Sequence, residues 1–164
     1  MKALAVVFIV LAAASGAEGI QEIRDLYYQT SADIEEGVFY TTVVNINSGD
    51  MSFPAVGIFG ITITFHWLAE PWNTPANRLV KAVVSSRVSA ALESSEFLYD
   101  ESGELAFCFI EGGYEQVEHR FYFSDGRLLR FIDGDEVNNS PDQSLGTAAS
   151  NRGAELHQAF MLMH

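Results

Sequence analysis

The clearest pattern in the chain is the alternation of large apolar and smaller or polar residues over 57–68, GIFGITITFHWL. An alternation of period two predicts a β-strand with one buried face and one face that is at least partly solvated. The side chains expected on the buried face are Phe59, Ile61, Ile63, Phe65 and Trp67. Thr62, Thr64 and His66 are expected on the opposite face.

Shorter runs predict further strands. Segment 38–46 is rich in β-branched and aromatic residues, which favours a strand. Segment 78–92 favours a strand as well, although its alanine-rich end leaves a helix open. Residues 47–50 predict a turn, and the proline-containing segment 69–77 predicts a loop.

Residues 97–132 predict two consecutive hairpins, which together form a four-strand meander. The second hairpin carries Asp125 and Gly126 between two alternating runs, and this pair predicts a tight turn with Gly126 at positive φ. The apolar residues of the meander alternate with polar ones and are expected to point inward. They are Phe107, Phe109, Phe121, Phe123 and Leu128.

Helices are predicted near both ends. Apolar residues at helical spacing over 20–36 predict an amphipathic helix that ends at Gly37. Segment 133–153 is polar and glycine-rich and predicts a mobile loop, while the last residues fit a short helix with Leu156 and Phe160 on one side. The fold class is therefore α+β, with an N-terminal helix packed on a curved antiparallel β-meander sheet of about six or seven strands. The short C-terminal helix either docks on this sheet or stays free of it.

The N-terminus predicts export. A positive start precedes an apolar run from Ala3 to Ala14, and small residues follow, which is the layout of a cleavable secretory signal. The run is shorter than the about 20 residues of a membrane span. We expect cleavage after Ala14, Ala17 or Gly19, and a periplasmic or extracellular protein. The expected organisation is a signal peptide at 1–19 and a single α+β domain at 20–137. Residues 138–164 are expected to form a polar linker, and whether they end in a short helix is left open.

Charge narrows the range of partners. The chain has 22 acidic and 9 basic residues and a formal net charge of −13. Such a surface repels phosphate backbones and anionic membrane surfaces, so we expect no nucleic acid as a partner. No second apolar run is long enough to span a bilayer, so we expect no integral membrane segment after signal cleavage. The single cysteine, Cys108, lies among apolar residues and is expected to be buried and unreactive.

Catalytic and metal-binding motifs are weak. Two histidines on predicted strands, His66 and His119, could form a site with Glu118 or Asp133, although ordinary sheet histidines are the favoured interpretation. The acidic segment that begins at Asp133 resembles a calcium loop at its start but lacks the glutamate required at position 12, which favours a solvated loop. We therefore expect no metal site, no catalytic residues and no cofactor.

One cluster suggests binding. Arg120, Tyr122, Arg127 and Arg130 gather on the last hairpin of an acidic chain, and arginine with tyrosine makes a good contact surface for an acidic ligand or a protein. The alternative, which the residues favour, is cross-strand ion pairing that stabilises the sheet by about 0.2–1 kcal/mol per pair. The carboxylates available for such pairing are Glu104, Glu111 and Glu118.

Three stretches carry a resemblance: IQEIRDLYYQTSADI, EFLYDESGELAFCF and HRFYFSDGRLLRFID, the last with the pattern Tyr-Phe-x-x-Gly-x-Leu-x-Arg. They resemble a group of small, exported, uncharacterised bacterial proteins with an N-terminal helix and a C-terminal β-meander. The resemblance covers 20–36 and 96–136 best, and it implies a compartment and a fold without an activity.

These observations together predict an exported, non-enzymatic binding or envelope-associated protein whose partner is an unknown protein or small ligand. The alternative is a small enzyme with a histidine and carboxylate site in the concave face of the sheet. A third interpretation is a structural role in a larger assembly.

Overall fold

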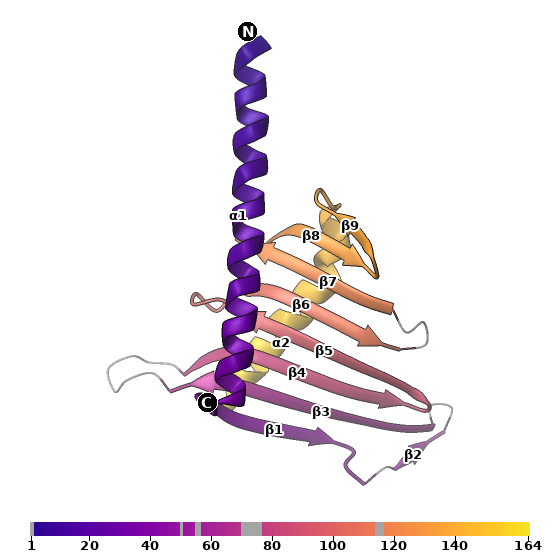
Figure 1. Cartoon of the computed structure of the whole chain (residues 1–164). Helices are drawn as coiled ribbons and strands as arrows, with labels where there is room; N and C mark the ends of the chain where they lie inside the picture. The colour runs from indigo at the N-terminus through magenta and orange to yellow at the C-terminus, as the bar shows by residue number, and fades with distance from the viewer. Residues whose placement is uncertain (1, 50, 55–56, 70–76, 114–116) are drawn as a thin grey trace.

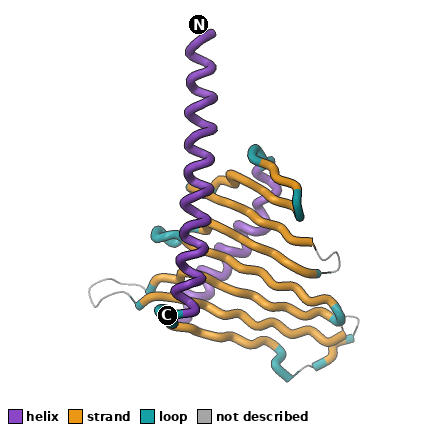
Figure 2. Tube along the Cα trace, in the orientation of Figure 1, coloured by secondary structure: helices purple, strands orange, loops and turns teal. Residues whose placement is uncertain are grey.

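The computed structural model describes residues 2–49, 51–54, 57–69, 77–113 and 117–164, with side chains from residue 18 onward. A nine-strand antiparallel sheet lies between an N-terminal and a C-terminal helix (Figures 1 and 2). This arrangement confirms the α+β class. The elements are α1 Lys2–Glu35, β1 Tyr40–Ile46, β2 Ser52–Phe53, β3 Gly57–Leu68, β4 Arg78–Val88, β5 Ala91–Tyr99, β6 Leu105–Gly112, β7 Val117–Ser124, β8 Arg127–Asp133, β9 Glu136–Asn138, the 3₁₀ turn η1 Gln143–Gly146 and α2 Thr147–Met163.

The strand order follows the chain, β1-β3-β4-β5-β6-β7-β8-β9, with the short β2 paired to β3. The turn between β7 and β8 has positive φ at Asp125 (50°) and Gly126 (68°), which confirms the predicted tight turn. We expected six or seven strands and find nine. The additional strands, β2 and β9, contain two and three residues and are too short to show a periodicity in the sequence.

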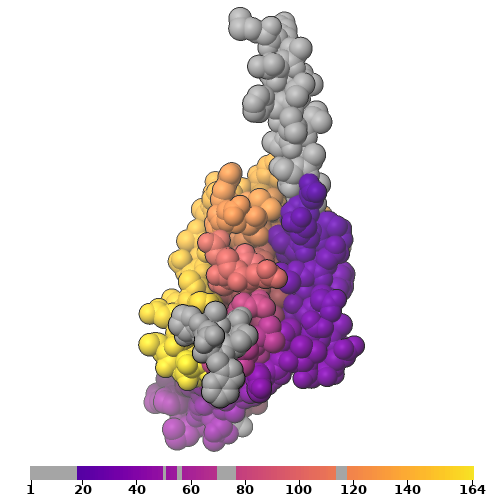
Figure 3. Space-filling model, turned by 90° about the vertical axis from the view of Figure 1, so that its left-hand side faces the viewer, coloured from indigo at the N-terminus to yellow at the C-terminus, as the bar shows by residue number. Residues whose placement is uncertain are grey.

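Helix α2 packs on one face of the sheet, here called the α2 face (Figure 3). The buried face of β3 was predicted correctly, because Phe65 is fully buried there and Ile61, Ile63 and Trp67 pack against the same cluster. The α2 side chain of Phe160 meets the Phe65 ring at a centroid distance of 6.0 Å. The buried members of this cluster are Phe65, Leu79, Ala82, Val84, Phe97, Tyr99, Cys108, Phe121, Phe123, Leu128, Ala149, Leu156 and Phe160.

Helix α1 packs on the opposite face, the α1 face, through a second and smaller cluster. Its buried members are Ile20, Ile23, Leu98, Ala106, Phe107, Tyr122 and Ile132. The five apolar residues of the meander point inward as expected, but they are divided between two clusters on opposite faces. Phe107 and Phe109 face α1, whereas Phe121, Phe123 and Leu128 face α2. Both faces of the central strands are covered by a helix, so both carry apolar side chains.

The two helices differ in extent from the prediction. Helix α1 ends before Gly37, which has a φ of 74° as expected of a helix stop, but the helix begins at Lys2 and includes the expected signal segment. Segment 133–153 is not a loop, because β9, η1 and the start of α2 lie within it. No helix in the described part of the chain is long and apolar enough to cross a membrane. The loop expected over 69–77 falls mostly outside the described residues.

Candidate binding groove

A groove of about 550 Å³ lies between helix α1 and the sheet and is here called the α1 groove. Its lining consists of aromatic, aliphatic and arginine side chains, without an acidic residue. A volume of roughly 300–1,000 Å³ is typical of sites for small molecules. The lining residues are Ile23, Arg24, Tyr27, Tyr28, Phe107, Phe109, Arg120, Tyr122 and Ile132.

Aromatic rings in contact form one side of the α1 groove. The Tyr27 ring meets the edge of Phe107 at a centroid distance of 5.2 Å, and Phe107 meets Tyr122 at 5.0 Å. Tyr28 extends the series at the rim, 5.9 Å from Tyr27 and largely exposed. Edge-to-face pairs at these distances are favourable, so the rings form a stable apolar surface.

Three guanidinium groups surround these rings. Arg24 of α1 and Arg130 of β8 each lie 6.0 Å from the centre of the Tyr122 ring, and Arg120 of β7 lies 5.3 Å from the centre of Phe109. Cation–π attraction operates within about 6 Å of a ring centre, so each arginine is at contact range. Such an arrangement places positive charge beside an apolar surface.

Two periodicities bring these residues together. Along β7, Arg120 and Tyr122 are two residues apart and therefore share a face, and the strand register places Arg130 directly opposite Tyr122. Along α1, Ile23 and Tyr27 are four residues apart and face the sheet, with Arg24 beside them at the edge of the stripe. The groove is thus formed where the apolar stripe of α1 meets the polar-and-aromatic face of the last hairpin.

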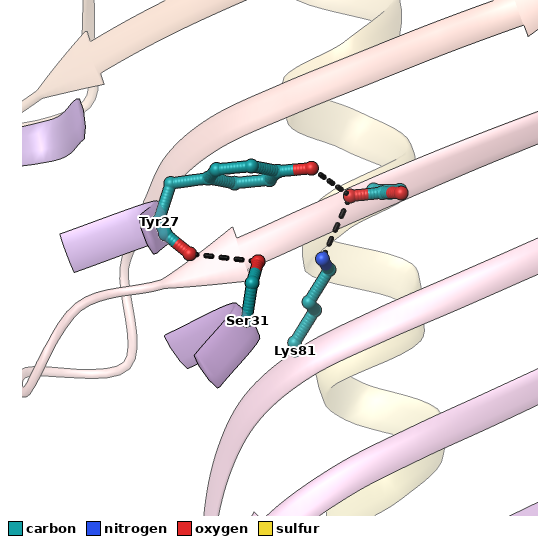
Figure 4. Close-up of polar contacts among 4 residues, drawn as sticks. Tyr27, Ser31 and Lys81 are labelled. Atoms are coloured by element: carbon teal, nitrogen blue, oxygen red, sulfur yellow. Dashed lines mark hydrogen bonds and ion pairs between the residues drawn. The ribbon is translucent and has the colours of Figure 1, made fainter. Parts of the chain in front are cut away.

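A partly buried polar network fixes the C-terminal half of α1 on the sheet (Figure 4). The Tyr27 hydroxyl donates a hydrogen bond of 2.9 Å to the Glu96 carboxylate, which also accepts the Lys81 ammonium at 2.7 Å. Ser31 Oγ donates to the Tyr27 carbonyl at 2.8 Å. Burial, followed by the Glu96 carboxylate, raises the pKa of Tyr27 to about 12. The Tyr27 hydroxyl therefore stays protonated and donates a hydrogen bond to Glu96. This bond holds one wall of the groove in position.

The structure brings three of the four expected binding residues together. Tyr122 and Arg120 line the α1 groove, and Arg130 lies beside it. Arg127 is not part of the lining; it adjoins the Asp125-Gly126 turn, and Gly126 lines a separate pocket together with residues of α2. Arg120 forms an ion pair with Glu118 of the same strand, β7. Glu118 therefore pairs within its strand and not across strands as expected.

Sequence reasoning missed the α1 side of the groove, namely Arg24, Tyr27 and Tyr28. A signal was present, since Arg24 and Tyr27 adjoin the apolar positions of an amphipathic helix. Which strands this helix would cover is a question of tertiary packing, and the stripe alone does not answer it.

The histidines do not form a shared site. His66 lies on the α1 face opposite Lys81, whereas His119 lies on the α2 face, with its ring 5.9 Å from Phe131 and Nδ1 3.2 Å from Asp133. Alternation explains this separation, because Phe65 next to His66 points toward α2. Within the described residues, no cluster of three or more histidine, cysteine or acidic side chains could hold a metal ion.

Two other candidates have structural explanations. Cys108 is fully buried, as expected, and burial raises the pKa of its thiol to about 12, so the reactive thiolate is disfavoured. Asp142 in the acidic segment caps η1 by accepting a hydrogen bond of 2.8 Å from the Ser144 amide. That bond lowers the pKa of Asp142.

Searches against protein-family models, curated proteins and solved structures find no match to this chain. The architecture is a β-meander between two helices, and the groove under the first helix is the candidate functional site.

Proposed function

We propose that this chain is an exported binding protein, periplasmic or secreted, that holds a small ligand in the α1 groove. The observation that carries the proposal is the groove itself: about 550 Å³, with aromatic walls and arginine side chains. Rings and arginines supply contact area, stacking and directed hydrogen bonds, which are the interactions of binding sites. Three of the four arginine and tyrosine residues singled out from the sequence lie at this groove.

Export is supported by the layout of residues 1–19 and is compatible with the packing of α1. The first described side chain buried on the sheet is Ile20, followed by Ile23. Cleavage after Ala14 or Ala17 would therefore leave the packed part of the helix complete. Fractionation of the native host, with intact mass of the recovered protein, tests this part. Recovery of the chain with Met1–Ala14 still attached would contradict export by this route.

Binding is tested with Nile red, an uncharged dye whose fluorescence rises in apolar sites. We expect saturable binding that weakens in Tyr28→Ala, because Tyr28 forms the rim of the groove. Tyr40→Ala is the matched control, since Tyr40 is similarly exposed on β1 and does not line the groove. Absence of saturable binding, or equal weakening in both variants, would overturn the proposed site.

A further inference from the structure

Resting on the proposed function, we infer that the ligand of the α1 groove is a carboxylate amphiphile, a molecule with one acidic head and an apolar body. The head lies beside the Tyr122 ring, within reach of Arg24 and Arg130, and the body lies along Tyr27, Phe107 and Tyr28. Two independent features of the groove, its charge and its apolar surface, carry this assignment.

The charge feature is a local excess of cations in an acidic protein. The groove lining contains two arginines and no acidic residue, although the chain has 22 acidic and 9 basic residues. Arg120 is neutralised by its ion pair with Glu118. Within the described part of the chain, Arg24 makes no ion pair, and the hydrogen bond of 2.6 Å from Arg130 Nε goes to Asn139, which is uncharged. Among the described side chains, the two guanidinium groups beside Tyr122 therefore have no carboxylate partner.

The geometry favours a carboxylate as that partner. A guanidinium group presents a planar fork of donors that matches the two oxygens of a carboxylate. Tyr122 orients both cations, because each lies 6.0 Å from the centre of its ring. Attraction to the ring favours side-chain positions near Tyr122 before the ligand arrives, which reduces the entropy lost on binding.

The apolar feature sets the rest of the ligand. Beyond Tyr122 the groove continues over Phe107 and Tyr27 to the exposed ring of Tyr28, with Ile23 and Ile132 completing the apolar lining. Water against such a surface is displaced favourably by an apolar group, at about 25 cal/mol per Å². A small inorganic anion would leave this surface wet, and an uncharged hydrocarbon would leave the two cations unpaired.

The test measures displacement of Nile red by three compounds with the same ten-carbon chain: decanoate, decan-1-ol and decyltrimethylammonium. We expect decanoate to displace the dye best and the cationic compound least. Arg24→Ala should weaken decanoate about tenfold, the effect of one charged hydrogen bond, and leave decan-1-ol unchanged. Arg152→Ala on α2 is the matched control and should change neither. Raising salt from about 50 to about 500 mM should weaken decanoate alone.

The outcomes separate this inference from the proposed function. If Nile red binds at the groove but the three compounds compete equally, or Arg24→Ala weakens all three alike, the carboxylate assignment is wrong and the binding function stands. If the dye does not bind saturably, both fall. An unchanged melting temperature shows that the Arg24→Ala variant is folded.

Discussion

The two faces of the sheet are covered by helices in different ways. Against α2 the contact is close and mostly apolar, with one buried hydrogen bond of 2.7 Å from the Tyr99 hydroxyl to the Gly153 carbonyl. A methyl group built on Gly153 would lie 3.0 Å from Leu105 Cδ2. Against α1 the contact is looser, with 3.5 Å between a methyl group on Gly19 and Leu129 Cδ1, and it includes arginines and the Lys81–Glu96 ion pair. The larger buried cluster lies on the α2 face, and the α1 groove lies on the other.

This difference separates two tasks. A close apolar contact contributes most of the stability of a domain, because apolar burial is the dominant favourable term. A looser contact with fixed polar groups leaves room for a ligand and costs stability that the other face must supply. The following substitutions test whether the faces divide in this way.

The largest effect is expected on the α2 face. Phe160→Ala should lower the free energy of unfolding by about 3–5 kcal/mol, because the Phe160 side chain of α2 is fully buried against the rings of Phe65 and Trp67. Denaturant unfolding measures this. The neighbouring Leu162→Ala, at an exposed position of the same helix, should change stability by less than about 0.5 kcal/mol. Equal effects of the two would show that α2 does not dock as described.

The next effect is expected from the ion pair on the α1 face. Glu96→Leu should cost about 3 kcal/mol, because it leaves the nearly buried Lys81 ammonium without its partner. The double change Lys81→Met with Glu96→Leu should recover most of this loss, since no buried charge remains. A double variant as unstable as the single one would assign the loss to the Tyr27 hydrogen bond instead.

A smaller effect compares the closeness of the two contacts directly. Alanine is favoured over glycine inside a helix by about 1 kcal/mol. Gly19→Ala should show this gain in the uncleaved chain, where residue 19 lies inside α1, because the added methyl meets Leu129 at an ordinary distance. Gly153→Ala should gain less or lose stability, because Leu105 has to move. Melting temperatures of the two variants measure the difference, and identical gains would contradict the closer α2 contact.

The smallest effect is on pH dependence. Burial lowers the pKa of His157 of α2, and burial together with the Lys81 charge lowers the pKa of His66 on the α1 face. As the pH falls through the ordinary histidine pKa of 6.5, these two histidines take up protons in the unfolded chain before they do so in the folded chain. The free energy of unfolding therefore decreases as the pH falls from about 7.5 to about 5.5. His66→Gln and His157→Gln should each reduce this loss in unfolding experiments.

Salt should distinguish the two histidines. Screening weakens the repulsion between His66 and Lys81 but leaves the burial of His157 unchanged. The pH dependence that is removed by His66→Gln should therefore shrink at high salt, and the part removed by His157→Gln should not. The same salt response at both positions would argue against the influence of Lys81.

Local patterns predicted the elements of the sheet well. The alternation of 57–68 placed β3 at the residues observed, and Asp125-Gly126 placed its turn, because both signals depend on neighbours in the sequence. The faces of β6 and β7 were not predictable in the same way. Phe107 and Phe121 look alike in the sequence, and only the presence of a second covering helix explains why they point in opposite directions.

The candidate site was half predictable for a related reason. Arg120, Tyr122 and Arg130 belong to one hairpin, so strand periodicity brings them together. Arg24 of α1 lies near the same Tyr122 ring although it is far from this hairpin in the sequence, so no local spacing encodes that contact. The helix α2 was underestimated because its first turns are polar and glycine-containing, and their stability comes from docking on the sheet.

The strand order has a consequence for the time course of folding. Each strand from β4 to β9 pairs with the strand immediately before it, so the sheet can grow one hairpin at a time without closing a long loop. Helix α1 is synthesised first, yet its apolar stripe packs on residues of β5 to β8, and its Tyr27 reaches Glu96 of β5. Its apolar stripe therefore has no partner until most of the sheet exists, and the first element made is among the last to reach its native place.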